Sequence, residues 1–249
     1  MRLPSPAKLR VFSFLESTAK SKVAVLGDDE VHAWVALPAL FTPQLEECVR
    51  LLSADELERM SRFRFQEHQQ NFLFSRSMLR ILLGTYLHVA PELLHFSYSV
   101  LGKPDLALPF AAADLRFNLS HSNGAALLAI CKGRRIGADI EKMREDFDPE
   151  EISTKFFSIQ ERHALMSLAE GARREAFFRC WTRKEALLKA KGGGLSLPLD
   201  LFDVSIGDES AVTLVTRPDP EEAEQWEILS VPVPSGYSAA IAVGKLPLK

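Results

Sequence analysis

A pair of acidic residues stands out in the stretch IGADIEKMRE, residues 136–145, because an apolar segment carries Asp139 and Glu141 two positions apart. Side chains alternate along a strand, so both carboxylates leave the same face if the segment is extended. Two carboxylates on one face repel each other unless a cation or a basic group lies between them. The spacing therefore indicates a cation site, although an edge strand with a solvated face would show the same pattern.

A third carboxylate comes from FFRCWTRKEALLKAKGGGL, residues 177–195. On a helix, Trp181, Glu185 and Lys189 are spaced i, i+4 and i+8 and share a face, and Lys184 lies next to Glu185. Mg²⁺ binds a few carboxylates and leaves its other positions to phosphate oxygens and water, while lysines hold the phosphates. The three acids and the lysines thus predict a magnesium and phosphate site. The alternative is that Glu185 and Lys189 form an ordinary surface pair.

The stretch NLSHS, residues 118–122, predicts a polar loop from Ser120 to Gly124 between apolar segments. Its hydroxyls and His121 could donate to phosphate oxygens, or they could bond to their own backbone in a turn. The other histidines lack metal-ligand spacing, and the three cysteines lack the spacing of a disulfide framework or a zinc site. No nucleophile elbow, Walker A or GxGxxG sequence is present.

The elements that would position these groups occur twice along the chain. The predicted segments are a strand at 31–38, helices over 52–89, strands within 94–109 and 115–131, the acidic strand at 136–141, a helical block at 154–191 and strands from 200 to 246. This order predicts an α/β (α+β) fold of two similar halves. We place the halves at 31–133 and 134–249, after an N-terminal extension at 1–30, so the acidic strand lies at their junction, where ligand sites are common.

The bulk composition indicates a globular protein. The chain has 249 residues, 47% of them hydrophobic, and a net charge of -3, so total charge does not indicate nucleic acid or an anionic membrane as a partner. No apolar run is long enough for a membrane span, and the N-terminus lacks a secretory leader. We expect a cytoplasmic protein. The first 22 residues are basic and are expected to be an irregular extension, with an organelle transit peptide as the alternative.

Five stretches together resemble one enzyme family. They are GKP at 102–104, FNLSHS at 117–122, IGADIE at 136–141, KFFSIQE at 155–161 and FFRCWTRKEALLKAKGGGLSLPLD at 177–200. In this order they resemble the 4'-phosphopantetheinyl transferases, and most closely the Sfp-like branch that serves peptide and polyketide synthases. The resemblance implies a pseudo-twofold fold with coenzyme A and Mg²⁺ bound where the halves meet. It also implies transfer of the 4'-phosphopantetheine arm to a serine of an acyl or peptidyl carrier protein, release of 3',5'-ADP, and a monomer.

The resemblance also implies roles for particular residues. The matched metal ligands are Asp139, Glu141 and Glu185. The residues matched to coenzyme A are Arg59, Gly102, Lys103, Pro104, Ser120, His121, Lys184 and Lys189. Phe72 stands where some relatives carry a polar phosphate ligand, so we expect Arg76 or Arg80 to replace it. Lys189 assists the transfer, and Glu161 is an acid that assists the metal or a proton transfer. The base that takes the serine proton is a metal-bound water or hydroxide, Glu185 or Glu161.

Two rival functions remain open at the level of sequence. The first is a magnesium-dependent phosphodiesterase or nucleotide hydrolase, and the second is a non-catalytic binding module that retains the fold. For a transferase, the carrier protein would dock on the 142–157 segment. Its candidate contacts are Lys142, Met143, Arg144, Phe147, Phe156 and Phe157, although the last could belong to the core.

Overall fold

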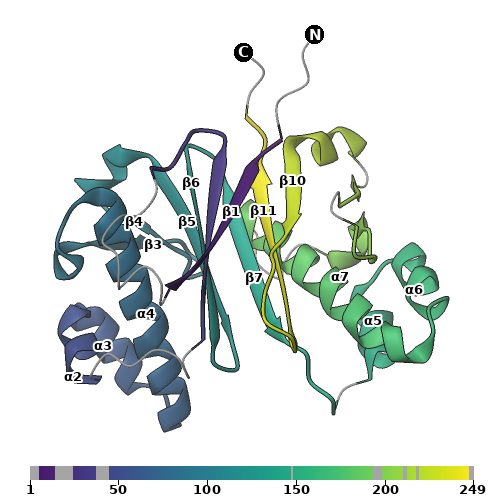
Figure 1. Cartoon of the computed structure of the whole chain (residues 1–249), viewed down its shortest axis with the longest axis horizontal. Helices are drawn as coiled ribbons and strands as arrows, with labels where there is room; N and C mark the ends of the chain where they lie inside the picture. Colours follow the sequence, from purple (N-terminus) through teal and green to yellow (C-terminus); the bar gives the residue numbers. More distant parts are fainter. Residues whose placement is uncertain are drawn as a thin grey trace.

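The fold is taken from a computed structural model that describes residues 6–14, 25–37, 45–146, 148–192, 198–209, 212–216 and 219–246 (Figure 1). Its strands are β1 (Lys8–Ser13), β2 (Glu30–Ala36), β3 (Phe96–Tyr98), β4 (Pro104–Leu106), β5 (Leu115–Ser122), β6 (Ala125–Lys132), β7 (Ile136–Lys142), β8 (Phe202–Val204), β9 (Leu214–Thr216), β10 (Trp226–Ser230) and β11 (Tyr237–Gly244). Its α-helices are α2 (Leu45–Leu51), α3 (Ala54–Ser61), α4 (Gln66–Leu87), α5 (Pro149–Phe156), α6 (Ile159–Met166) and α7 (Glu170–Lys191).

The same order of elements occurs in both parts of the chain. In the first part, β2 is followed by α4, the β3–β4 hairpin and then β5 and β6, which form a sheet in the order β1-β2-β6-β5. In the second part, β7 is followed by α7, the β8–β9 hairpin and then β10 and β11, in the order β10-β11-β7. The helices α4 and α7 each have 22 residues. The repeated order confirms the expected fold of two similar α/β halves, and we propose 31–133 and 134–249 as their bounds.

The molecule is layered, with the two sheets between α4 and α7 (Figure 1). One apolar cluster fills the space between α4 and the first sheet, and another fills the space between α7 and the second sheet. A third cluster joins the sheets, with Leu127 and Ala129 of β6 packed together with Ala138 and Ile140 of β7. The residues of β7 therefore alternate: one set lies in the core between the sheets, and Asp139 and Glu141 lie on the face that α7 covers.

The two sheets meet where β5 runs beside β7, and polar side chains join them there. The backbone N–H groups of Ala138, Ile140 and Lys142 donate to side chains of β5, at 2.8, 3.4 and 3.2 Å. The acceptors are Asn118 Oδ1, Ser120 Oγ and Ser122 Oγ, respectively. The other edge of β7 pairs with β11. These three side chains satisfy donors that would otherwise be left at the edge of a buried strand.

The N-terminal segment contributes a strand, which corrects the expectation of an irregular extension. Residues 8–13 form β1, which pairs in parallel with β2 through a register from Lys8 with Glu30 to Ser13 with Val35. Alternating residues of this segment pack in the first core, including the fully buried Phe14. The irregular reading was wrong for this stretch because a strand of six residues at a sheet edge shows little periodicity in sequence.

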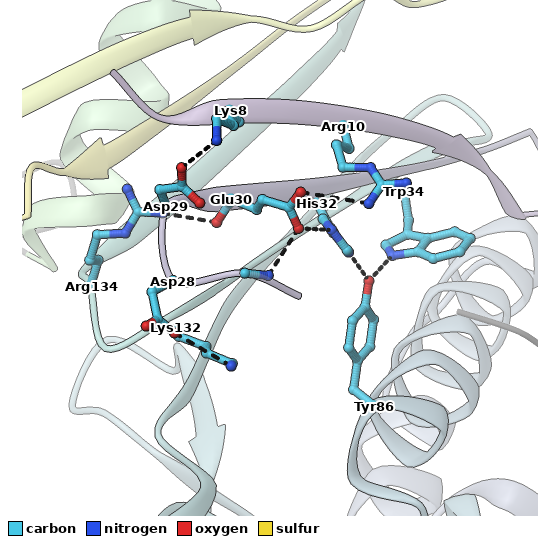
Figure 2. A network of polar contacts seen from close by, with 11 residues as sticks. Lys8, Arg10, Asp28, Asp29, Glu30, His32, Trp34, Tyr86, Lys132 and Arg134 are labelled. Carbon is cyan, nitrogen blue, oxygen red and sulfur yellow. Dashed lines mark hydrogen bonds and ion pairs between the residues drawn. The ribbon is translucent and has the colours of Figure 1, made fainter. Parts of the chain in front are cut away.

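A network of polar contacts holds β1 and β2 in place (Figure 2). Trp34 donates to the hydroxyl of Tyr86 at 2.9 Å, and that hydroxyl lies 2.5 Å from Nδ1 of the buried His32. The other ring nitrogen of His32 lies 3.2 Å from Glu30 Oε2. These contacts form an unbroken chain if His32 is neutral and carries its proton on Nε2. The network lies away from the acid pair and serves the fold.

Among the described residues, no helix combines the length and the apolar character that crossing a membrane requires.

Candidate active site

Strand β7 lies very close to the backbone of α7 at Gly137, two residues before the first of the paired acids. A side chain at that position would collide with the Ala186 carbonyl oxygen and the Ala190 amide nitrogen of α7. Only glycine lets the strand lie this close to the helix backbone. The contact brings Asp139, two residues further along β7, against the side chain of Lys189.

Asp139 is the most tightly held acid of the site. Its side chain is only 3% exposed, and its Oδ1 lies 2.5 Å from Nζ of Lys189 and accepts from Ser120 Oγ at 3.1 Å. Lys189 also donates to Ser120 at 3.1 Å, so the three groups form a closed triangle. Oδ2 of Asp139 is buried and has no hydrogen-bond partner within the described part of the chain. A buried carboxylate oxygen without a donor is costly unless a ligand or ion completes it.

Glu141 and Glu185 share the negative field of Asp139. Burial raises the pKa of each above its ordinary value, and the charge of Asp139 raises both further. The charge of Glu141 also raises the pKa of Glu185, whereas Lys189 lowers the pKa of both glutamates. Ser122 donates to Glu141 at 2.6 Å and opposes the rise in its pKa. The three acids therefore lie within electrostatic reach of each other and carry an excess of negative charge.

The carboxylates of Asp139, Glu141 and Glu185 suit a hard cation, although they are not arranged as a complete coordination site. Across the described ranges, no three His, Cys, Asp or Glu side chains are grouped closely enough to hold an ion. The group that contacts Asp139 is the ammonium of Lys189 rather than a second carboxylate. The unpartnered Oδ2 of Asp139 and the mutual repulsion of the acids nevertheless fit Mg²⁺, which prefers carboxylate oxygen.

His121 of β5 lies in the field of two basic side chains, Lys189 of α7 and Arg76 of α4. The pKa of His121 lies below its ordinary value because the protein around the ring reduces its hydration, and the charges of Lys189 and Arg76 lower it further. His121 lies on β5 directly after Ser120, although its side chain is exposed at the surface. The charges of one lysine and one arginine thus act on the same imidazole. A group of positive charges held this close fits an anion.

Arg76 is a buried arginine with spare hydrogen-bonding capacity. Its guanidinium lies over the rings of Phe72, Phe96 and Tyr98, with centroid distances of 5.6, 5.9 and 5.6 Å. Its nearest acid, Glu56, is 3.8 Å away, and Nη1 is buried with no partner among the residues that the structure describes. Burial lowers the pKa of Arg76, and the neighbouring charge of Arg59 lowers it further. Arg59 is exposed on α3 and lies 5.8 Å from the Phe72 ring, so the two arginines flank one ring.

Arg80, the alternative to Arg76, is used by the fold. Its Nε lies 2.7 Å from Glu56, and its Nη1 donates to the carbonyls of Pro91 and Leu94 at 3.0 Å each. Glu56 also accepts from the backbone of Ser53 at the start of α3, where the two residues form a capping box. These bonds occupy Arg80 inside the first half.

A pocket of about 580 Å³ opens at the junction of the halves. Lys103 and Pro104 of the β3–β4 hairpin line one side, and Arg134, Arg135 and Ile136 line the other. Gly102 has a φ of +77° in the turn of this hairpin, where a left-handed conformation favours glycine. The structure thus brings the GKP turn to the beginning of the acidic strand.

Glu161 and Lys184 lie together but away from this site, which corrects the roles expected for them. Lys184 Nζ lies 2.8 Å from Glu161 and donates to the carbonyls of Leu199 and Phe202 at 2.7 and 2.6 Å. Glu161 also accepts from the backbone of Val204 at 2.8 Å, and both side chains are at most 2% exposed. All of these contacts lie in the core beside α6 and β8. The pair therefore has a structural role, and neither residue is placed to contact phosphate or to move the serine proton.

Two further expectations change in detail. Ser120 and His121 lie within β5 rather than in a loop, and only Asn123 and Gly124 form the turn, both with positive φ. The polar residues of NLSHS were mistaken for a loop because the hydrogen-bond partners of Ser120 and Ser122 lie on β7, in another part of the chain. In the 142–157 segment Phe157 is buried in the core, Phe156 is exposed, and Phe147 lies outside the described residues.

Two residues of the site were missed in the sequence, Asn118 and Gly137, and the hydroxyl of Ser122, considered there as a phosphate donor, donates to Glu141. Asn118 and Ser122 flank Ser120 at i−2 and i+2 and hold β7, as described above. Their alternation along one strand face was a usable signal. Gly137 interrupts an apolar strand, and such a glycine often marks a close backbone approach.

Comparisons with known proteins bear on both halves of the chain. Residues 135–242 match the family model of the 4'-phosphopantetheinyl transferase superfamily, and residues 39–132 match the model described as 4'-phosphopantetheinyl transferase, N-terminal. The 4'-phosphopantetheinyl transferase HetI of Nostoc sp. is 39% identical over 215 residues, which cover 86% of this chain and 88% of the relative. The 4'-phosphopantetheinyl transferase Sfp of Bacillus subtilis is 29% identical and covers 79% of this chain and 84% of its own. Among solved structures, the Chronobacterium ammoniagenes ACPS-CoA complex covers 46% of this chain and 98% of its own, with a TM-score of 0.34 and 16% identity.

Proposed function

The chain belongs to the 4'-phosphopantetheinyl transferase superfamily and is an enzyme of that class, and we propose that it converts apo carrier proteins to their holo form. The donor is coenzyme A, the acceptor is a serine of an acyl or peptidyl carrier protein, and the second product is 3',5'-ADP. One observation carries this proposal: Asp139, Glu141 and Glu185 of β7 and α7 form an acid group around Lys189, and Lys189 also belongs to a basic group with His121 of β5 and Arg76 of α4. A diphosphate ester with a divalent cation complements such a pair of groups.

Asp139, Glu141 and Glu185 are the residues that would hold Mg²⁺. The unpartnered Oδ2 of Asp139 and the raised pKa values of the two glutamates support this assignment, because a divalent cation would relieve both. The ion would neutralise the pyrophosphate and stabilise the charge that develops on the departing ADP. Ser120 and Ser122 orient the acids by donating to Asp139 and Glu141.

The phosphates of coenzyme A would take the basic group as their partners. Lys189 lies next to Asp139 and is one-third exposed, so its ammonium can reach a phosphate while staying beside the acid. Arg76 offers a buried Nη1 that lacks a partner in the described ranges, and His121 lies in its field and in that of Lys189. Arg59 adds an exposed positive charge at the rim. The adjacent pocket, with Lys103 and Pro104 in its hairpin wall and Gly102 in the turn before them, is the proposed place of the nucleotide.

The transfer requires one bond to form and one to break. The serine oxygen bonds to the phosphorus that carries the pantetheine arm, the phosphorus–oxygen bond to ADP breaks, and the serine proton goes to a base. We assign Glu185 as the carboxylate of this chain that receives it, since Glu161 is enclosed in the core.

The carrier protein would dock beside the acids on the 142–157 segment. Phe156 is 38% exposed and packs edge-on against Trp181, and Arg144 is exposed. An exposed aromatic ring and a positive charge on one segment suit a partner with acidic residues around an apolar contact. Phe157 is no longer part of this proposed surface because it is buried.

The setting of the enzyme is part of the proposal. The three cysteines are free and buried, which supports a reducing compartment, and we propose the cytoplasm. The groups of the proposed site come from both halves of one chain, which supports a monomer.

The test is mass spectrometry of a panel of apo carrier proteins incubated with the enzyme, coenzyme A and Mg²⁺. The expected result is the mass gain of one phosphopantetheine group on the acceptor serine, with 3',5'-ADP released in equal amount. Glu185→Gln should lose most of this transfer, whereas Glu170→Gln, an exposed glutamate on the same helix, should not. Consumption of coenzyme A without a mass gain would instead establish a hydrolase, and binding without consumption would establish a non-catalytic module. Chelation of Mg²⁺ should abolish the transfer, and its restoration by added Mg²⁺ tests the metal assignment.

A further inference from the structure

The β3–β4 hairpin of the first half carries a lysine that reaches into the second half. The turn is closed by hydrogen bonds from Gly102 N to Ser99 O at 2.8 Å and from Ser99 N to Lys103 O at 2.9 Å. The left-handed conformation of Gly102 then sets the direction in which Lys103 leaves the turn. Lys103 is half-buried, and burial lowers its pKa.

The ammonium of Lys103 is bound to two backbone carbonyls from different elements. It donates to the carbonyl of Ile136 at 2.8 Å and to that of Lys189 at 2.8 Å. Ile136 is the first residue of β7, and Lys189 lies in the last turn of α7. The last carbonyls of a helix have no partner inside the helix, and the helix dipole favours a cation there. Lys103 thus caps α7 and ties it to the start of β7.

The two carbonyls flank the closest approach of the strand and the helix. Gly137 follows Ile136 and lies against the α7 backbone at Ala186, Lys189 and Ala190. Asp139 is two residues further on, and its partner is the side chain of Lys189. A change in the position of β7 along α7 would therefore move Asp139 relative to Lys189. Lys103 holds both at the point where that position is set.

We propose that Lys103 is a positioning residue for phosphopantetheinyl transfer, acting by fixing β7 against α7 rather than by binding a phosphate. The inference rests on the proposed function, since that function gives Asp139 and Lys189 their roles. It also links the nucleotide pocket to the acid site, because Lys103 lines the pocket and binds both catalytic elements.

The first test separates turnover from binding. Lys103→Met keeps the length of the side chain and removes its donors, so we expect kcat to fall about 10- to 100-fold, as for small misplacements of reacting groups. The KM for coenzyme A should stay within about twofold, and dephospho-coenzyme A should show the same fall in kcat. Lys103→Arg, which keeps donors and charge, should recover part of the activity. Lys132→Met is the matched control, because Lys132 is exposed and its ammonium lies 3.5 Å from the exposed carboxylate of Asp28, a surface pair outside the proposed site.

The opposite pattern would overturn the inference. A raised KM with unchanged kcat, found with coenzyme A and absent with dephospho-coenzyme A, would show that Lys103 binds the 3'-phosphate. If the wild-type enzyme transfers nothing to any carrier, the proposed function fails first, and that result is distinct from either pattern.

A second test needs no variant and therefore does not depend on folding of the Met variant. The wild-type protein is treated briefly with acetic anhydride, and acylation of each lysine is followed by mass spectrometry. Lys103 should react much more slowly than Lys132 both without and with coenzyme A, since its ammonium is bound to two carbonyls in the free enzyme. Reaction of Lys103 at the rate of Lys132, with protection only when coenzyme A is added, would contradict the inference.

Discussion

Helix α7 carries the lysines of two lysine–carboxylate pairs, whose carboxylates come from α6 and β7 and whose surroundings differ. Lys184 and Glu161 form one pair, in which the ammonium has three acceptors and the carboxylate also receives backbone N–H donors. Lys189 and Asp139 form the other, in which one carboxylate oxygen is buried without a donor in the described residues. Both Lys184 and Glu161 are fully enclosed, whereas Lys189 is one-third exposed.

The difference shows how a structural pair is distinguished from a site. A buried ion pair persists when further hydrogen bonds complete both partners, because the cost of desolvation is otherwise not offset. The Lys184 pair meets this condition. The Lys189 pair does not, and it is also crowded by Glu141 and Glu185, whose pKa values are raised. A buried carboxylate oxygen without a hydrogen bond and several negative charges close together indicate a place where a ligand is required.

The strongest test of this comparison is Asp139→Asn. Loss of the central charge should lower kcat about 1,000-fold, or about 4 kcal/mol of transition-state stabilisation. The free energy of unfolding should change little, because the amide can still accept from Ser120 and Lys189. Transfer assays and urea unfolding measure the two quantities, with Asp28→Asn as the control at an exposed aspartate. Wild-type turnover at limiting Mg²⁺ would show that Asp139 is not part of the site.

Lys184→Met should have the opposite signature. Removal of the ammonium leaves the carboxylate of Glu161 buried and uncompensated, so the free energy of unfolding should fall by about 3–5 kcal/mol. Burial already raises the pKa of Glu161 although Lys184 opposes the rise. The KM for coenzyme A of the folded fraction should remain that of the wild type, as measured below the unfolding temperature.

A matched double variant sharpens this second prediction. Glu161→Leu combined with Lys184→Met removes both charges, so it should recover much of the lost stability. If Lys184→Met instead left stability unchanged and raised the KM for coenzyme A, Lys184 would bind phosphate as the sequence suggested, and the two pairs would not differ in kind.

The smallest expected effect concerns His32, which belongs to another completed network (Figure 2). Burial lowers the pKa of His32 in the folded protein, so the unfolded chain takes up the proton first as pH falls. Stability is then lost as pH decreases through the unfolded pKa of about 6.5, at no more than about 1.4 kcal/mol per pH unit from this group. Urea unfolding between pH 7.5 and 5.5 should show a steeper loss for wild type than for His32→Gln. Equal slopes would remove His32 as a source of acid sensitivity, and His121 contributes equally to both proteins.

Much of the fold followed from local patterns in the chain. Alternation in IGADIE predicts a strand with Asp139 and Glu141 on one face, and β7 has that arrangement. The GKP turn between two apolar segments predicts the β3–β4 hairpin, and the repeated order of helices and strands predicts two similar halves. These features depend on neighbours a few residues apart, whose periodicity is visible in the sequence.

The roles of the individual charged residues did not follow from local patterns. Lys184 and Lys189 lie five positions apart on α7 and therefore on different faces. Nothing in the helix says which face meets Asp139 and which meets Glu161. Likewise, Ser120 was expected in a loop because its hydrogen-bond partners lie on β7. In the sequence, β7 follows Ser120 only after another strand and a turn.

By itself the sequence determined the type of enzyme, the order of its elements and the three acids that share a field. Only the tertiary structure decided that Lys189 rather than Lys184 contacts Asp139, that Glu161 belongs to the core and that Lys103 donates to backbone carbonyls of two elements. The physical reason is that a charged side chain takes its role from the groups that complete its hydrogen bonds. Those groups are brought together across 33, 50 and 86 residues of chain.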